Sequence, residues 1–186
     1  MKFNMGCGAD IREGWINVDK FHDGLLQPDY MLFDLDLSPW PWKSNCAETV
    51  LFNHSLEHMG QDSMIFCGLM IELYRICCDG AEVFINVPHP RHDDFLNDPT
   101  HVRPITPDML ALFDRRQCLE WQRQKKANTP LALICKVDFR IVRANAIVDP
   151  QILQVYLGDD ENIRVAAGMY NNVLKEWQLV LKVDKS

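Results

Sequence analysis

The chain has 186 residues, of which 47% are hydrophobic, and a formal net charge of −7. We expect one globular domain over residues 1–186, because this length can bury a sizeable core. No apolar run approaches the roughly 18 residues of a membrane span, and no leader is expected. The acidity disfavours a nucleic-acid partner, since phosphate binding needs clustered Lys and Arg. Seven cysteines without a C-x-x-C pair favour reduced thiols and a cytoplasmic protein.

Seven short apolar segments rich in β-branched and aromatic residues are expected to form strands. They are residues 2–5, 15–18, 30–34, 48–53, 81–87, 138–146 and 176–183. Only residues 6–14 separate the first two strands, whereas a parallel crossover that contains a helix needs at least about a dozen residues. We therefore expect a loop in place of the first crossover helix.

Helical periodicity predicts a helix over residues 62–78, with Asp62 or Ser63 as N-cap and Asp79-Gly80 as its end. A second helix is predicted from Thr106 to residue 124, because threonine is a good N-cap and the proline that follows fits the first turn.

Two irregular stretches, residues 88–135 and 149–174, are expected to be insertions that cover the substrate or form a lid. The second contains a weaker predicted helix over residues 150–158. These stretches would shape the pocket of the substrate.

The turn after the first strand combines small residues with a nearby carboxylate. Gly6 and Gly8 follow that strand directly, and the second apolar run ends at Asp19. In an α/β sheet such glycines let a ligand lie against the backbone, because any side chain would hold it away. A carboxylate at the end of the next strand can bind a ribose diol. These residues indicate a ligand that contains a nucleoside.

Six segments in order resemble the class I S-adenosylmethionine (SAM)-dependent methyltransferases, in particular the small proteins of the methyltransferase type 11 group. They are Asn4-Met5-Gly6-Cys7-Gly8, Asp19, Asp34-Leu35, residues 53–58, the run from Glu72-x-x-Arg75 to Pro88, and residues 98–103. The resemblance covers roughly residues 1–113. It implies an α/β fold with a Rossmann-like class I methyltransferase sheet, mostly parallel and closed by an antiparallel last strand.

The resemblance also implies SAM as the cofactor and a set of contacts to it. In the family, the residue matching Asp19 binds both ribose hydroxyls, the one matching Asp34 faces the adenine amino group, and Leu35 would lie against the ring. Asn4 departs from the family, which usually has an acidic residue there. The implied cofactor contacts are Asn4, Gly6, Cys7, Gly8, Asp19, Asp34, Leu35, Asn53 and His54.

Methyl transfer from a sulfonium mainly requires alignment and exclusion of water, and a base only when the acceptor is protonated. We expect His101, His54 and Asp98 to be the catalytic residues, because they follow predicted strands on the side of the crevice. The expected acceptor is a small molecule or a glycan precursor, with oxygen favoured over nitrogen. The alternative is a protein that binds SAM or S-adenosylhomocysteine without turnover.

A metal site is a further alternative at the segment after the fourth strand. His54, Glu57 and His58 have i, i+3, i+4 spacing, which places three ligand-type side chains on one face of a helical turn, and His101 offers a fourth. A related constellation occurs in the small-RNA 3′-end methyltransferases, with glutamate at the position of His54. The net acidity weighs against an RNA substrate, so the sequence favours a site without metal.

Overall fold

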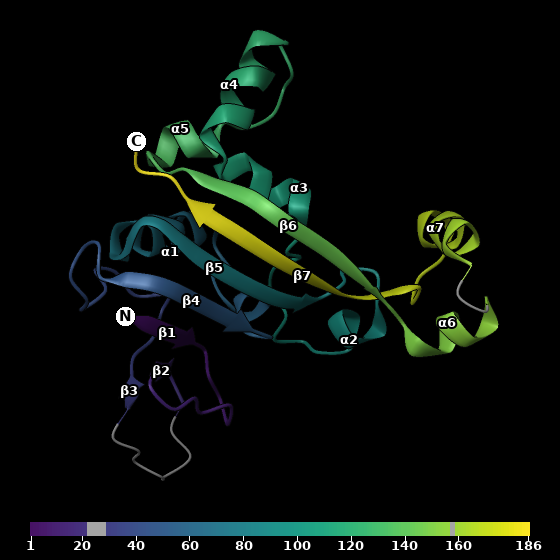
Figure 1. The fold of residues 1–186 in the computed structure, drawn as a ribbon, viewed down its shortest axis with the longest axis horizontal. Coiled ribbons are helices and arrows are strands. Elements are labelled where there is room, and N and C mark those ends of the chain that lie inside the picture. The colour runs from purple at the N-terminus through teal and green to yellow at the C-terminus, as the bar shows by residue number, and fades with distance from the viewer. Residues whose placement is uncertain (22–28, 157–158) are drawn as a thin grey trace.

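The computed structural model describes residues 1–21, 29–156 and 159–186. These residues form a seven-stranded sheet in the order β3-β2-β1-β4-β5-β7-β6 (Figure 1). Strand β7 is antiparallel to both of its neighbours, whereas the other pairs are parallel. The predicted α/β sheet with an antiparallel last strand is confirmed. The strands are Lys2–Met5 (β1), Ile16–Asp19 (β2), Tyr30–Leu32 (β3), Ala47–Asn53 (β4), Cys77–Pro88 (β5), Phe139–Val148 (β6) and Leu174–Val183 (β7).

The first crossover is a loop, as predicted, because residues 6–15 join the parallel strands β1 and β2 without a helix. The side chain of Asn17, which is fully buried, holds this loop. Its Oδ1 accepts hydrogen bonds from the Arg12 N–H (3.0 Å) and Asn4 Nδ2 (3.1 Å), and its Nδ2 donates to the Arg12 carbonyl (3.0 Å). A buried amide thus does here what helix packing does in an ordinary crossover.

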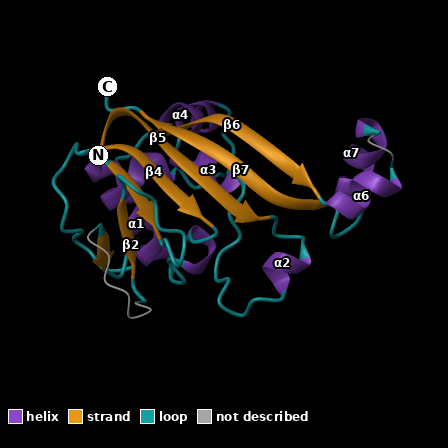
Figure 2. Cartoon of the chain, turned by 60° about the horizontal axis from the view of Figure 1, so that its bottom comes forward, coloured by secondary structure: helices purple, strands orange, loops and turns teal. Residues whose placement is uncertain are grey.

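Helix α1 (Ser63–Ile76) begins at the predicted N-cap, where Asp62 accepts the Met64 N–H. Its apolar side packs on the sheet. Helices α1, α3 (Pro107–Leu110) and α4 (Arg115–Arg123) all lie on the same face of the sheet (Figures 1 and 2). An edge-to-face pair of Phe66 and Phe113 joins α1 to the segment after α3, and a second pair of Tyr74 and Phe139 joins α1 to β6. Within the described residues, no helix covers the opposite face of β4, β5 and β7.

The predicted single helix over residues 106–124 is wrong, although its Thr106 N-cap is confirmed. The segment divides into α3 (Pro107–Leu110), the 3₁₀ turn η2 (Ala111–Phe113) and α4 (Arg115–Arg123). Asp114 interrupts it with an extended backbone, and its carboxylate accepts the Gln117 N–H as a new N-cap.

The predicted end of α1 at Asp79-Gly80 is also wrong. The helix ends at Ile76, and β5 starts at Cys77 with extended backbone. Gly80 lies inside β5 with φ +76°, where the register against β4 shifts. The glycine therefore serves a strand irregularity rather than a helix terminus.

The two predicted insertions contain the remaining helices. Residues 88–135 hold α2 (Asp93–Leu96) and α5 (Leu131–Cys135) besides α3 and α4, and residues 149–174 hold α6 (Pro150–Val155) and α7 (Asp160–Met169). Helix α6 matches the third predicted helix up to residue 155, while residues 157–158 lie outside the described part. Helices α6 and α7 project beyond the sheet (Figure 1). None of the described helices is both long enough and apolar enough to cross a membrane.

Candidate functional site

A cleft of about 380 Å³ lies at the carboxyl ends of the parallel strands, and its size is typical of a small-molecule site. Residues that directly follow β1, β2, β3 and β4 form most of its wall, as expected for an open α/β sheet. The lining residues are Gly6, Gly8, Asp19, Lys20, Phe21, Phe33, Asp34, Leu35, His54, Ser55, His58, Met59 and Thr100.

The glycine turn and Asp19 meet in this cleft. Gly6 has φ +67°, and a Cβ added to it would lie 2.5 Å from the Cβ of Ser55. The carboxylate of Asp19 accepts the Gly8 N–H at 2.8 Å and the Phe21 N–H at 2.9 Å. Bare backbone and an oriented carboxylate therefore face the same space.

Another part of the wall is largely apolar, and hydrogen bonds from the protein interior hold its backbone in place. Phe33 and Leu35 line the cleft next to Asp34. The Leu35 carbonyl accepts the indole N–H of Trp40 at 3.1 Å, and the Trp40 backbone N–H donates to Glu72 Oε2 at 2.6 Å. This wall is suited to a flat, largely apolar ring beside one carboxylate.

Three of the expected cofactor contacts do not line the cleft. The amide of Asn4 is buried and donates to Asn17 Oδ1. Asn53 Oδ1 accepts a hydrogen bond from Asn86 Nδ2 at 3.0 Å, and Cys7 is buried. Their side chains face the protein interior or the neighbouring strand, so any contact of these three residues with the cofactor stays a prediction.

Of the three expected catalytic residues, only His54 lines the cleft. Its backbone is left-handed (φ +51°), and its Nε2 lies 2.9 Å from Glu176 Oε2. Asp98 is half-buried and accepts two hydrogen bonds from Thr100, which lower the pKa of the Asp98 carboxyl. His101 is stacked on Phe95 and directed toward Glu57 instead.

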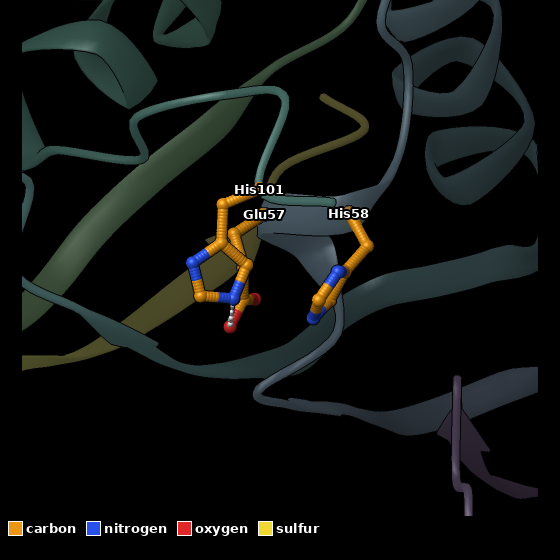
Figure 3. A group of neighbouring side chains, drawn as sticks. All are labelled: Glu57, His58 and His101. Atoms are coloured by element: carbon orange, nitrogen blue, oxygen red, sulfur yellow. Dashed lines mark ion pairs between the residues drawn. The ribbon is translucent and has the colours of Figure 1, made fainter. Parts of the chain in front are cut away.

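The 3₁₀ turn η1 (Leu56–His58) receives the loop of residues 98–103. The backbone N–H groups of Val102 and Arg103 donate to the Glu57 carbonyl at 2.9 and 3.1 Å. This docking places His101 beside Glu57 and His58 (Figure 3). Burial raises the pKa of the Glu57 carboxyl to about 7, and the carboxylates of Asp98 and Glu176 act in the same direction.

Sequence reasoning assigned no cleft role to His58, Met59, Phe33 or Thr100, which all line the cleft. His58 belongs to the predicted segment of residues 53–58, and Met59 and Phe33 adjoin predicted motifs, so their position after a strand end was the available signal. Thr100 lines the cleft only because the loop of residues 98–103 docks on η1.

The strand order, the antiparallel β7 and the cleft over the strand ends define the fold of the class I SAM-dependent methyltransferases. The chain is similar to a SAM-dependent methyltransferase from Archaeoglobus fulgidus (17% identity, TM-score 0.55, covering 97% of this chain and 85% of that one). It is also similar to one from Methanosarcina mazei (10% identity, TM-score 0.57, covering 100% and 92%).

A third similar structure is the 1,6-didemethyltoxoflavin-N1-methyltransferase of Burkholderia thailandensis, which contains bound S-adenosylhomocysteine (10% identity, TM-score 0.53, covering 99% and 71%). No family model matches the chain, and the search of curated proteins found no match by sequence. At these identities the similarity shows the fold.

Proposed function

We propose that the chain is a SAM-dependent methyltransferase whose acceptor is a hydroxyl group of a small molecule or a glycan precursor. The observation that carries the proposal is the meeting of Gly6, Gly8 and Asp19 in one cleft of this fold. In this proposal the bare backbone of Gly6 and Gly8 holds the methionine part, and Asp19 holds the ribose.

The geometry of Asp19 supports binding of a diol. Each carboxylate oxygen has two acceptor sites, and the backbone N–H groups of Gly8 and Phe21 each occupy one site on a different oxygen. Both oxygens therefore retain a site for one hydroxyl. Asp34 and the apolar side chains of Phe33 and Leu35 supply the matching wall for adenine.

When bound, SAM supplies an electrophilic methyl group on a sulfonium. The chain would contribute orientation, shielding from water and a route for the proton that a hydroxyl releases as it is methylated. Of the three expected catalytic residues, His54 lines the cleft and is our candidate for accepting that proton. Asp98 and His101 do not line the cleft. Histidines and carboxylates at this end favour a hydroxyl acceptor, because a neutral amine needs no base.

Thermal shift and isotope transfer test the proposal. We expect stabilisation by SAM and S-adenosylhomocysteine but not by NAD, since only ligands that bind the native state raise its melting temperature. Methyl-labelled SAM incubated with a metabolite extract should give a labelled product. Absence of stabilisation by both sulfur ligands at millimolar concentration would contradict the proposal.

The second candidate is a protein that binds SAM or S-adenosylhomocysteine without methyl transfer. One solved structure with the same fold is a [4+2]-cyclase (TM-score 0.52, 11% identity), so this fold also serves other chemistry. Binding without any labelled product across the extract would favour this candidate.

A further inference from the structure

Three ligand-type side chains meet beside the cleft without a role in the proposed SAM contacts. Glu57, His58 and His101 each place one ligand atom within 4.8 Å of the other two. Figure 3 shows their side chains directed to the same side of the backbone. Two of them come from η1, and the third comes from the loop that docks on η1 through its backbone.

Hydrogen bonds fix the proton on Nδ1 of both imidazoles. Nδ1 of His101 lies 2.9 Å from the Phe95 carbonyl, and Nδ1 of His58 lies 3.2 Å from the Thr100 carbonyl. A carbonyl only accepts, so each Nδ1 must donate and each neutral ring keeps its lone pair on Nε2. A backbone carbonyl bound to the distal ring nitrogen is the usual support of a histidine that binds metal.

The hydroxyl of Thr100 fits the same assignment. Its Oγ1 donates to Asp98 Oδ1 at 2.6 Å and lies 2.9 Å from His58 Nδ1. Because the hydroxyl proton points to the carboxylate, the oxygen accepts from His58. The Nε2 of His58 therefore stays available as a ligand.

Glu57 lacks the partner that its burial demands. Its side chain is 1% exposed, and neither carboxylate oxygen has a hydrogen-bond partner within the described residues. The closest ring nitrogens are His54 Nδ1 at 3.8 Å and His101 Nε2 at 3.9 Å, beyond hydrogen-bond distance. A buried carboxylate is unfavourable unless it is paired or binds a cation.

No other positive charge in the described chain compensates this carboxylate. Among the residues that the structure describes, neither Glu57 nor its neighbours Asp98 and Glu176 forms an ion pair with Lys or Arg, and only histidines lie within ion-pair distance of them. The guanidinium of nearby Arg103 is directed to the Gly60 carbonyl and the Phe66 ring. The cluster is therefore short of a cation.

We propose that Glu57, His58 and His101 bind one divalent first-row transition-metal ion through a carboxylate oxygen and two Nε2 atoms. Two imidazoles and one carboxylate suit Zn²⁺, Fe²⁺ or Co²⁺, whereas Mg²⁺ and Ca²⁺ prefer oxygen ligands alone. Atoms about 2.1 Å from one ion lie at most about 4.2 Å apart. The three ligand atoms lie within 4.8 Å of one another, so the side chains would move together by some tenths of an ångström when the ion binds.

This site differs from the set that the sequence suggested. His54 is not among the proposed ligands, because its Nε2 forms an ion pair with Glu176. His101 is a proposed ligand here, whereas the sequence analysis expected it to act as a base. His58 and Thr100 also line the cleft, so an open coordination position would face it. Placing the acceptor oxygen at that position is a role that rests on the proposed function, whereas the metal site itself does not.

Co²⁺ titration of the full chain tests the site. The protein, freed of affinity tag and treated with EDTA, should bind one equivalent and show weak visible absorption without the intense near-ultraviolet band of cobalt thiolates. Glu57→Gln and His58→Gln should each lower the affinity at least tenfold, while the control His89→Gln, outside the cluster, should leave it unchanged. Circular dichroism verifies that each variant is folded.

Other outcomes overturn the proposal. These are no stoichiometric binding of Co²⁺ or Mn²⁺ at millimolar concentration, a thiolate band that places the ion on cysteines, or unchanged affinity in the folded Glu57→Gln and His58→Gln variants. Binding of S-adenosylhomocysteine is measured separately on the metal-free protein. Failure of the protein to bind a metal ion and failure to bind S-adenosylhomocysteine can therefore be told apart.

Discussion

The backbone N–H of Gly8 donates to Oδ2 of Asp19 at 2.8 Å, so the carboxylate proposed to hold the ribose also shapes the glycine turn. The Phe21 N–H donates to the other oxygen at 2.9 Å. These two bonds orient the carboxylate before any ligand arrives, which reduces the loss of side-chain entropy on binding.

Replacing Asp19 with Ala should weaken S-adenosylhomocysteine binding by about 2–3 kcal/mol, because two charge-assisted hydrogen bonds are lost. Isothermal titration calorimetry measures this change. Asp10→Ala is the matched control, since the Asp10 carboxylate lies in the same loop but binds Arg12. Unchanged affinity of the Asp19 variant would refute the ribose assignment.

Alanine at the two glycines of the turn should act differently. Gly6→Ala combines a left-handed backbone with a Cβ 2.5 Å from Ser55, and we expect a loss of about 2–4 kcal/mol of unfolding free energy. Gly8 has φ +48° and open space around its Cβ, so Gly8→Ala should lose only about 1 kcal/mol. Urea denaturation ranks the two variants, and equal losses would contradict the close approach at Gly6.

The ion pair of buried Glu72 with half-buried Arg75 should make stability depend on acid pH. Hydrogen bonds from Arg75 lower the pKa of the Glu72 carboxyl below its ordinary 4.5. A lowered pKa stabilises the fold above the unfolded-state pKa, and this contribution disappears as pH falls through the folded-state pKa. Glu72→Gln should therefore cost about 1–3 kcal/mol at pH 7 and progressively less as pH falls below the unfolded-state pKa.

Urea denaturation between pH 7 and pH 3 measures this difference for wild type and Glu72→Gln. Glu120→Gln provides the control, because Glu120 pairs with Arg123 at the same i, i+3 spacing on the exposed surface of α4. Solvent screens that pair, so its removal should change little. A loss from Glu72→Gln that does not vary with pH would argue against the buried carboxylate.

Asn17→Ala should destabilise the protein by about 2–4 kcal/mol, because it leaves buried donors and acceptors of the first loop without partners. The same variant should weaken cofactor binding, since Gly6 and Gly8 begin that loop. Thermal denaturation and calorimetry report the two effects. Asn145→Ala, at an exposed position of β6, should affect neither.

Local features of the sequence were sufficient to predict most strands and the N-caps at Asp62 and Thr106. They were not sufficient at Asp114, where the helix restarts. There the Arg115 N–H donates to Oδ1 of Asp138, the residue just before β6, and no local pattern encodes this contact. Tertiary contacts override local helix propensity at that point.

The candidate site divides in the same way. Gly6, Gly8, Asp19 and Asp34 were found because residue type and position after a strand both matched their expected roles. The docking of residues 98–103 uses backbone donors of Val102 and Arg103, which every residue except proline possesses. Residue type therefore gave no signal for these backbone contacts, which bring Thr100 to the cleft.

The loop held by Asn17 has a consequence for local motion. Residues 8–14 are exposed or half-buried, so freeing them from β2 would uncover little apolar surface. Such an opening should depend weakly on urea and proceed while the hydrophobic core stays intact, and amide hydrogen exchange at Gly8 and Arg12 would reveal it. In this protein the entrance for the ligand can loosen by breaking a few polar contacts, a freedom that a packed helix would suppress.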